Sequence, residues 1–529
     1  MLQIGDISLR PEQDKPDNLR RAAAERLGVP VSALGAVTPL RRSIDARRKD
    51  AVRVLYRVLV SAEDEAALLA AAAGAEPYVE AVYAPPQPRR LPPERPVVAG
   101  FGPAGMFAAL ALAEAGLRPV VLERGLPVAE RTERVRRFWE TGRLDEDCNV
   151  QFGEGGAGAF SDGKLNTGVS GGEADYVLRR FVDFGAQRRI LWDAAPHVGT
   201  DVLKTVVTNL RARVTALGGE VRFGARLEGL RFSGGRLSQA VYTQGGSRES
   251  LDCAALFLAI GHSSRDTLAA LWADGVAMTP KAFSMGVRVE HLQAEIDRTQ
   301  YGRYAGHPAL GPASYKLAVH LPDGTGVYTF CMCPGGYVVA AASEAGGVVT
   351  NGMSYSGRAG TNANGALLAS LGVDKFPYPG PLGGVRWQRE LEQAAFQAAG
   401  GDYRAPAQLL GDFLAGRASA GPGRVRPTYQ PGVQWGDLRA VLPTVVTQPL
   451  AQALPLLERR FRGYAAPYAV LTGPETRSSS PVRMPRDEGR QAVGLAGLYP
   501  CGEGAGWAGG IVSAAADGLK SAAAYLESL

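Results

Sequence analysis

Cysteine is scarce in this sequence, and its scarcity excludes two kinds of protein. The 529 residues contain 5 cysteines, an odd number. They are too few for the framework of a small disulfide-rich domain, and no pair has the Cys-x-x-Cys spacing of structural zinc sites. We therefore expect reduced thiols and no metal site. The cysteines are Cys148, Cys253, Cys331, Cys333 and Cys501.

Long apolar runs are missing as well. No segment approaches the roughly 18–20 apolar residues that a membrane-spanning helix needs. Residues 1–15, MLQIGDISLRPEQDK, lack the apolar centre of a secretory signal. The composition, 46% hydrophobic and 21% charged, is typical of a soluble globular protein. The sequence therefore predicts a cytoplasmic protein that does not bind membranes.

A concentrated positive charge is the third absence. The net charge of +6 is spread over the whole length. The densest basic stretch, residues 40–53, is interleaved with acids and has no aromatic residue for base stacking. This pattern disfavours a nucleic-acid partner and indicates a solvated loop that leads into a strand. The alternative, an RNA platform in residues 1–85, rests on this basic stretch.

The length predicts several domains, because 529 residues exceed the size of one ordinary core. Helical spacing in residues 18–29 and 62–74 and a strand pattern in 51–60 predict a small ferredoxin-like α+β domain over residues 1–85. The Pro- and Arg-rich residues 86–96 indicate a linker.

The rest of the chain alternates in character. Strand and helix patterns follow one another in residues 97–276 and return in 476–529, whereas residues 277–475 are rich in strands and turns. We therefore predict an α/β fold with a Rossmann-type nucleotide-binding domain. An α+β substrate or cap domain, residues 277–475, interrupts it.

Glycine is abundant, with 67 residues, and three stretches carry the spacing G-x-G-x-x-G. They begin at Gly100, Gly153 and Gly504. The spacing is specific for a dinucleotide only when an apolar strand precedes it, a helix follows it and an acidic residue ends the next strand. Only the first stretch meets these conditions: PVVAG precedes it, MFAALALAEAG follows it, and Glu123 ends PVVLE.

Each glycine of the first motif has a physical reason. Gly100 allows a tight turn, Gly102 lets the backbone approach a pyrophosphate, and Gly105 lets helix and strand pack closely. The helix start offers unpaired N–H groups to phosphates. Glu123 would accept hydrogen bonds from ribose hydroxyls and would repel a 2′-phosphate. The motif therefore predicts an NAD- or FAD-type site.

The other two motifs lack this context and predict loops around a shared ligand. No buried strand precedes residues 153–158 and no helix follows them, so residues 151–168 are expected to form a shaped loop with backbone donors. Residues 504–509 precede a good helix, but no acid-ended strand follows. The useful feature there is the helix N-terminus, which can face an anion or an electron-rich ring.

These segments resemble the FAD oxidoreductases with a glutathione-reductase-like fold, and more closely a bacterial family of largely uncharacterised FAD-dependent dehydrogenases. The resemblance spans nearly the whole chain and includes QFGEGGAGAFSDGKLNT, TFCMCPGGYVV, GMSYSGRAGTNAN and GPETRSSSPVRM. It implies one bound FAD. No second complete βαβ fingerprint is present for a separate NAD(P)H domain, so NAD(P)H or another electron carrier would bind transiently.

The resemblance also implies a role for each matching position. One group would hold the ADP half of FAD, with Val221 meeting adenine through its backbone. A second group would contact the pyrophosphate, the ribityl chain and the flavin pyrimidine edge; here Glu503 stands where such proteins usually carry Asp. The loop would cover the pyrophosphate and the ring. In chain order the positions are Gly100, Gly102, Pro103, Ala104, Gly105, Glu123, Arg124, Gly155, Gly156, Ser161, Asp162, Gly163, Lys164, Val221, Gly261, Gly502, Glu503, Gly509, Gly510 and Ile511.

No residue is assigned to catalysis, and five are candidates. Cys331 and Cys333 share one side of a predicted strand. They are either a thiol pair that faces the substrate or two buried small residues before a turn. The second interpretation is favoured, because no base or resolving partner is evident in the sequence. Lys164, with Asp162, either contacts the flavin or forms a plain ion pair.

Two arginines complete the five candidates, and one histidine is expected to have no catalytic role. Arg358 and Arg477 lie in loops of the inserted domain and could clamp a carboxylate substrate, although surface arginines are common in this chain. His262 follows Gly261 directly and is expected to be a loop histidine with a backbone partner rather than a general base.

The predicted function is that of an FAD-dependent oxidoreductase, a dehydrogenase. It would exchange a hydride between flavin N5 and an unidentified small organic substrate held under residues 277–475. Two alternatives remain open: a flavin-dependent RNA-modifying enzyme that uses residues 1–85 as its platform, and a flavin-binding protein without enzymatic activity.

Overall fold

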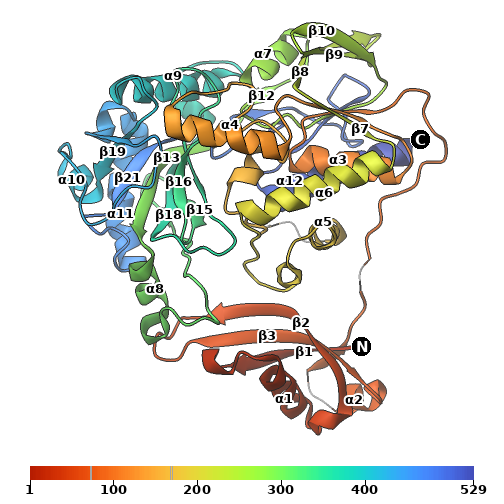
Figure 1. Ribbon diagram of the computed structural model, residues 1–529, viewed down its shortest axis with the longest axis vertical. Coiled ribbons are helices and arrows are strands. Elements are labelled where there is room, and N and C mark those ends of the chain that lie inside the picture. Colours follow the sequence, from red (N-terminus) through yellow and green to blue (C-terminus); the bar gives the residue numbers. More distant parts are fainter. Residues whose placement is uncertain (72–73, 81, 167, 169–170) are drawn as a thin grey trace.

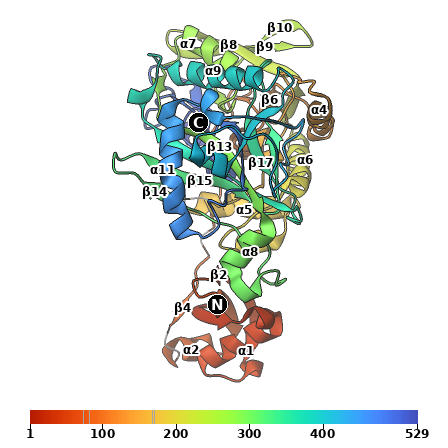
Figure 2. The ribbon, with the colours of Figure 1, turned by 90° about the vertical axis from the view of Figure 1, so that its left-hand side faces the viewer.

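The computed structural model describes residues 1–71, 74–80, 82–166, 168 and 171–529. Residues 72–73 of the predicted helix 62–74, and Thr167 of the predicted loop 151–168, lie outside the described residues. Figure 1 shows a small N-terminal domain below a larger body, and Figure 2 shows the same separation from the side.

The N-terminal domain is a four-stranded antiparallel sheet with two helices. Strand β3 buries every second residue, Val54, Tyr56, Val58 and Val60, as a sheet with one covered face requires. The element order βαββαβ, with sheet order β2-β3-β1-β4, is that of ferredoxin-like folds. The elements are β1 (Leu2–Leu9), α1 (Pro16–Leu27), β2 (Leu34–Asp45), β3 (Arg53–Ala62), α2 (Glu65–Ala71) and β4 (Ala75–Pro77).

The basic stretch 40–53 is partly a strand, so the prediction of a loop is wrong for residues 40–45. They form the end of β2, which pairs with β3 from Leu34 to Asp45. No clear strand pattern is visible in the sequence here, because β2 is an edge strand whose residues are mostly half-buried or exposed. Charged side chains are common on such edges, where they discourage pairing with other chains.

A five-stranded parallel sheet forms the centre of the nucleotide domain, in the order β23-β11-β5-β6-β7. The chain starts in the middle at β5, builds one side with β6 and β7, and then builds the other with β11 and β23. The strand order therefore reverses at β5, and open α/β sheets bind ligands beyond the carboxyl ends of the strands at such a point. The strands are β5 (Val97–Ala99), β6 (Val120–Glu123), β7 (Glu220–Phe223), β11 (Leu256–Leu258) and β23 (Leu498–Pro500).

Helices and a small antiparallel sheet, β8-β9-β10, surround these strands (Figure 1). Helix α3 is buried over ten consecutive residues, since it lies between the sheet and α12. The two helices approach closely at Gly518, where an added Cβ would lie 2.0 Å from the Ala104 carbonyl oxygen. The elements are α3 (Pro103–Glu114), α4 (Val128–Thr141), α5 (Gly172–Asp183), α6 (Thr200–Ala216), β8 (Ala225–Ser233), β9 (Arg236–Gln244), β10 (Ser247–Asp252), α7 (Arg265–Ala273) and α12 (Ile511–Ser528).

The inserted domain is built on a seven-stranded sheet of order β14-β15-β18-β13-β21-β19-β20. Its core includes Leu450, Leu454 and Leu457, which α11 packs onto the sheet. The elements are β13 (Phe283–Leu292), α8 (Gln293–Tyr301), β14 (Ala318–His320), β15 (Gly326–Cys333), β16 (Tyr337–Ala340), β17 (Thr350–Met353), β18 (Asn362–Leu371), α9 (Gly383–Ala398), β19 (Ala405–Leu409), α10 (Leu410–Ala415), β20 (Val433–Trp435), α11 (Thr444–Arg460) and β21 (Val470–Glu475).

The chain leaves and re-enters the nucleotide domain through two paired strands, β12 (Thr279–Pro280) and β22 (Val482–Arg483). A mixed α/β body with a central parallel sheet and an N-terminal antiparallel sheet domain is therefore confirmed. The residue limits predicted for the domains stay predictions. Among the described residues, no helix combines the length and apolar character that crossing a bilayer demands.

Candidate functional site

The first two glycine motifs meet at the carboxyl end of β5. The Gly155 N–H donates to the Phe101 carbonyl oxygen over 2.9 Å. A Cβ added at Gly156 would lie 3.0 Å from Gly102 Cα, and one added at Gly158 would lie 3.3 Å from the Ile511 side chain. The loop that follows α4 therefore lies over the start of α3 and touches the start of α12.

The third motif packs against the same turn. A Cβ at Gly502 would lie 2.8 Å from Ala104 Cβ, and one at Gly504 would lie 2.6 Å from the Gly261 carbonyl oxygen. Four segments that are far apart in the sequence therefore pack closely against one another at their glycines. We call these segments, residues 100–105, 153–158, 261 and 502–510, the glycine cradle.

Two helices begin in the glycine cradle without a side-chain cap. Gly102 is the N-cap of α3 and Gly510 is the N-cap of α12, and neither helix start has a side-chain cap hydrogen bond. The first-turn N–H groups and the positive ends of both helix dipoles are therefore available to an anion. Apart from their chain neighbours, none of the described residues places a heavy atom within 4 Å of a Cβ built at Gly261 or Gly509, so open space adjoins these donors.

Glu123 ties the glycine cradle to the sheet. Its carboxylate is 5% exposed and accepts hydrogen bonds from the N–H groups of Phe101 at 2.7 Å, Gly125 at 2.9 Å and Gly153 at 2.9 Å. A carboxylate has about four lone-pair sites. One acceptor position therefore remains for a ribose hydroxyl, while the other three hold the first and second motifs in register.

The residues of the glycine cradle fit a dinucleotide cofactor such as FAD. Uncapped N–H groups suit a pyrophosphate, and the glycines leave no side chain between those groups and a ligand. The Glu123 carboxylate at the end of β6 suits a ribose. Val221 lies on the neighbouring strand β7, opposite Val121 of β6, while Phe223 of β7 is opposite Glu123.

Arg124 has partners of its own. Its guanidinium pairs with Asp266 at 2.7 Å and lies over the Phe152 ring, 4.4 Å from the centroid. This places Arg124 beside the second motif, where Phe152 precedes Gly153. A contact between Arg124 and the ADP half of FAD stays a prediction.

The second half of the loop 151–168 faces the inserted domain instead of α3. Asp162 is fully buried, pairs with Arg358 at 2.6 Å and with Lys164 at 3.4 Å, and accepts a hydrogen bond from Ser354. A Cβ at Gly163 would lie 2.8 Å from the Gly199 backbone nitrogen. The plain ion pair that the sequence allowed for Asp162 and Lys164 is therefore present. The flavin contacts of Ser161, Asp162, Gly163 and Lys164 stay predictions.

The charges around Asp162 shift two pKa values. Burial would raise the pKa of Asp162, but Lys164 and Arg358 outweigh burial and lower it to about 2. His197 forms a backbone bridge with Lys164, and its Nε2 lies 3.3 Å from the Ser356 carbonyl oxygen. Burial, together with Arg358, lowers the pKa of His197 to about 4. At neutral pH this cluster therefore contains an ionised Asp162 and a neutral His197.

Cys331 and Cys333 end β15 at an irregularity in its pairing with β18. Cys333 is fully buried and Cys331 is partly exposed. The Arg288 guanidinium, also fully buried, donates to the Cys331 carbonyl oxygen at 2.8 Å and pairs with Glu475 at 2.7 Å. The sequence showed no partner for these thiols, whereas the structure places charged side chains from other segments beside them.

Arg477 belongs to a buried ion-pair network that joins the two domains. Its guanidinium donates twice to Glu392, at 3.0 and 2.7 Å, and also donates to Ser263 and Ser343. Arg265 of α7 pairs with the same Glu392 at 2.8 Å. All sides of the Arg477 guanidinium are engaged, so the predicted carboxylate clamp would require the network to open. We call Arg265, Glu344, Glu392 and Arg477 the ion-pair network.

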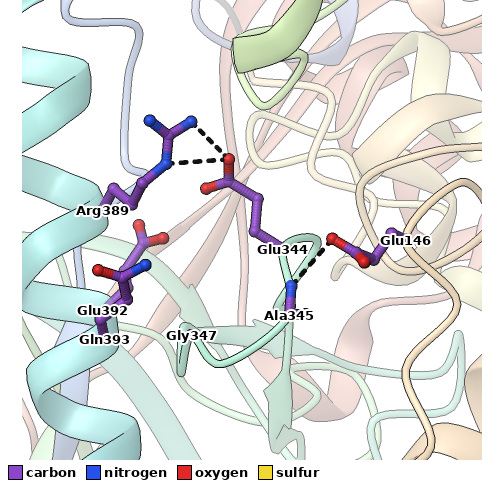
Figure 3. A pocket seen from close by; sticks show the side chains of 7 residues that line it. All are labelled: Glu146, Glu344, Ala345, Gly347, Arg389, Glu392 and Gln393. Atoms are coloured by element: carbon purple, nitrogen blue, oxygen red, sulfur yellow. Dashed lines mark hydrogen bonds and ion pairs between the residues drawn. The ribbon is translucent and has the colours of Figure 1, made fainter.

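A pocket of about 240 Å³ opens beside the ion-pair network. In Figure 3, Arg389 of α9 reaches Glu344, and Glu146 accepts a hydrogen bond from the Ala345 N–H at 3.0 Å. The lining carries three carboxylates, Glu146, Glu344 and Glu392. The two buried arginines of the network balance much of this charge.

A second pocket, of about 600 Å³, lies between the N-terminal domain and the body and is lined by Tyr56 and Trp192 among others. Arg42 spans this boundary: its side chain pairs with Asp14 at 2.7 Å, and its backbone pairs with residues 192–194. The neighbouring basic residues Arg47 and Arg48 pair with Asp45 and Asp50. Because Arg42, Arg47 and Arg48 are paired with acidic residues, these contacts give no support to an RNA platform in residues 1–85.

His262 has an acidic neighbour in place of the expected backbone partner. It is 8% exposed, and its Nδ1 lies 3.6 Å from Glu503 Oε1. Its Nε2 is buried and has no hydrogen-bond partner among the described residues. The contact brings the segment after β11 next to the closing motif.

Sequence reasoning missed the buried partners of the charged candidates. Glu392, Arg288 and Glu475 are nearly or fully buried. A single sequence gives no signal for them, because each lies in an ordinary helix or strand pattern and meets its partner only after folding.

Comparison with known proteins gives the family. Residues 282–478 match the model described as "FAD-dependent protein, C-terminal domain-like", and residues 1–61 match a domain of unknown function. An uncharacterised protein from Clostridium beijerinckii is 43% identical over 530 residues, which covers 99% of this chain and 98% of that protein.

Solved structures are similar at low identity. A flavin-dependent brominase matches with 11% identity and a TM-score of 0.37, covering 82% of this chain and 78% of the other. A geranylgeranyl bacteriochlorophyll reductase-like protein from Thermoplasma acidophilum matches with 13% identity and a TM-score of 0.35, covering 81% and 77%.

The match to the Clostridium protein runs through all three parts of the fold. The match to the domain model covers the part that contributes β13 to β21. The chain therefore belongs to the family of the Clostridium beijerinckii protein and carries the C-terminal domain of FAD-dependent proteins.

Proposed function

We propose that the chain is an FAD-dependent oxidoreductase, a dehydrogenase that exchanges a hydride with a small organic substrate. The observation that carries this proposal is the convergence of three glycine motifs and two uncapped helix starts on one place. When bound, FAD supplies a two-electron centre whose N5 gives or takes the hydride. The reaction belongs in the cytoplasm, where thiols stay reduced.

The chain's own groups have distinct tasks in this proposal. The N–H groups of Ala104 and Gly105, at the start of α3, would bind the pyrophosphate, and the remaining acceptor position of Glu123 would bind a ribose hydroxyl. Glu503, next to His262, would bind the ribityl chain. The N–H groups at Gly510 and Ile511 would face the flavin, where the positive end of the α12 dipole stabilises negative charge.

The loop 153–158 excludes water from the start of α3, because it packs directly on Gly102 and Pro103. Water exclusion strengthens every electrostatic contact inside a site. The inserted domain closes the other side through the Asp162 pairs with Arg358 and Ser354. A substrate would lie between these two layers, and NAD(P)H or another electron carrier would have to approach from outside them.

Substitution of Gly102 by alanine tests the cofactor site without disturbing the fold. Gly102 has a φ of −82°, and an added Cβ would make only an ordinary contact, 3.6 Å from Gly156 Cα. The methyl group would, however, stand where the backbone approaches the pyrophosphate. We expect the purified wild type to be yellow, and G102A to lose FAD affinity by at least about tenfold, ~1.4 kcal/mol.

The matched control is Gly421→Ala. Gly421 lies in the inserted domain, and nothing lies within 4 Å of its Cβ position. Flavin absorbance per protein and the affinity for added FAD are measured on all three proteins. Full flavin occupancy in G102A would contradict the assigned site. A colourless, folded wild type that takes up no FAD would contradict the function.

A further inference from the structure

Cys331 lies at a strained bulge that brings it close to Cys333. Cys331 has a φ of +41°, which non-glycine residues rarely adopt, and the register of β15 against β18 shifts between Phe330 and Cys333. The Cys333 thiol donates a hydrogen bond to the Cys331 carbonyl oxygen, with Sγ 3.2 Å from that oxygen. The two cysteines are separated by one residue at this bulge, so only local movement is needed to bring their sulfur atoms together as a disulfide.

Lys164 lies in the same cluster as the two thiols. Its Nζ is shielded from solvent and has no hydrogen-bond partner among the described residues, and the nearest carboxylate oxygen, on Asp162, is 3.4 Å away. Burial would lower the pKa of Lys164, but Cys333, Asp162 and Cys331 outweigh burial and raise it. The lysine is therefore charged, and the two thiols are among the groups that it faces.

The two carboxylates of this cluster are each already paired with an arginine. Asp162 makes two hydrogen bonds to Arg358 and Glu475 makes two to Arg288, so both carboxylates are matched by an arginine. Lys164 therefore shares Asp162 with Arg358, and buried charges need a counter-ion. A thiolate on Cys331 would provide one. The charged and titratable groups around the thiol pair are Lys164, Arg288, Asp162, Glu475 and Tyr315.

The two thiols differ in a way that suits two roles. The neighbouring Cys333 thiol lowers the pKa of Cys331, helped by Lys164 and Arg288 against the effect of burial. The neighbouring Cys331 and burial raise the pKa of Cys333. Cys331, which is partly exposed, is thus the thiolate that a small reagent reaches first, and Cys333 holds its proton behind it.

We propose that Cys331 and Cys333 form a redox-active dithiol that reduces low-molecular-weight disulfides, with Cys331 as the attacking thiolate and Cys333 as the resolving thiol. The Cys331 thiolate attacks one sulfur of the disulfide, forms a mixed disulfide and releases the first thiolate. As Cys333 attacks Cys331 Sγ, its proton passes to the departing sulfur, which carries it to solvent. The Cys331–Cys333 disulfide forms and the second thiol leaves. The substrate disulfide gains the two electrons that the cysteine pair loses, so this step needs no flavin and stands apart from the function proposed above.

The stoichiometry of thiolate release tests this sequence of steps. The protein as isolated, after mild reduction and removal of the reductant, is mixed with an aromatic nitrobenzoate disulfide whose released thiolate is coloured. We expect two equivalents per chain in the fast phase, and mass spectrometry should find a Cys331–Cys333 disulfide. Cys333→Ser should release one equivalent and keep the mixed disulfide at Cys331. Cys331→Ser should slow the first release about a hundredfold, because a buried thiol is mostly protonated.

Cys253→Ser is the matched control, since Cys253 is 2% exposed and burial raises the pKa of its thiol to about 12. It should react as the wild type does. One equivalent from the wild type with a stable mixed disulfide at Cys331, or no fast release from a folded wild type, would overturn the proposal.

The role of Lys164 has a separate readout in the pH profile of alkylation at Cys331 by iodoacetamide. Lys164→Met should raise the midpoint of that profile by about one unit or more, and Lys164→Arg should restore it. Lys281→Met is the control, because Lys281 is another lysine with a partly buried environment and pairs with the Ser480 carbonyl oxygen. An unchanged midpoint in Lys164→Met would show that Lys164 does not stabilise the thiolate.

Discussion

The glycine cradle and the ion-pair network join distant parts of the chain in opposite ways. In the cradle, backbone meets backbone, as at Gly504 against Gly261 and Gly156 against Gly102. In the network, long charged side chains meet in the interior, where Glu392 and Arg265 are 1% and 2% exposed. The cradle leaves N–H groups for a ligand, whereas the network satisfies its own charges.

The glycine cradle is thus suited to binding a ligand, and the ion-pair network is suited to stabilising the fold. A buried ion pair costs desolvation for both partners, and loss of one partner leaves the other charge unmatched. A glycine costs backbone entropy, but it admits a ligand to the main chain. We therefore expect substitutions in the network to act mainly on stability, and a substitution at Gly102 to act mainly on cofactor binding.

The largest expected effect comes from Glu392→Gln. This change leaves the Arg265 and Arg477 guanidinium groups without their shared counter-ion, and we expect a loss of about 3–5 kcal/mol of stability. Arg389→Gln is the control on the same helix, because the Arg389 side chain is 40% exposed and pairs with Glu344 at the edge of the network; its cost should stay below about 1 kcal/mol. Urea denaturation at saturating FAD measures both. Equal losses of unfolding free energy in the two variants would contradict a stabilising role specific to the buried network.

The next effect is a difference in stability between two variants of the same motif, Gly105→Ala and Gly102→Ala. A Cβ at Gly105 would lie 1.9 Å from the Gly100 carbonyl oxygen, a backbone atom that cannot move away cheaply, whereas Gly102 has room for one. Gly105→Ala should therefore destabilise the protein by about 1–3 kcal/mol, and Gly102→Ala should leave its stability unchanged. Thermal unfolding without FAD removes the contribution of binding. A destabilised G102A would mean that Gly102 serves the fold.

The third effect, absent at neutral pH, is a pH dependence of stability at the boundary between the nucleotide domain and the inserted domain. The pKa of His197 is lowered to about 4 in the folded protein, below its ordinary value near 6.5. As pH falls from 6.5 towards 4, the unfolded chain binds a proton that the folded chain does not, so stability is lost over this window. His197→Gln should reduce the loss by roughly 1–3 kcal/mol. Exposed His320→Gln is the control, and an equal change in both variants would exclude His197 as the cause.

The sequence revealed the glycine cradle because its signals are local. Gly100, Gly102, Gly105 and Glu123 lie within one βαβ unit, where spacing alone describes strand, turn and helix. The convergence of the other two motifs was predicted as three loops around one ligand. The structure adds which glycines touch and shows that Glu123 already holds the second motif through Gly153.

The ion-pair network and the cluster around Lys164 could not be predicted in the same way. Glu392 lies on α9 and Arg265 on α7, and nothing in either helix pattern indicates that they meet. The bulge at Cys331 was hidden because the alternation of a regular strand described residues 326–333 well enough. Lys164 and the thiols come from different domains, so their proximity is a property of the fold and not of any segment.

The number of FAD molecules that each chain binds tests the central claim most directly. The three glycine motifs are spaced like three separate nucleotide sites, but the structure joins them in one glycine cradle. Calorimetric titration of the flavin-free protein with FAD should give one site per chain, and G102A should weaken that one site. Two or more sites, or none in a folded protein, would contradict the account.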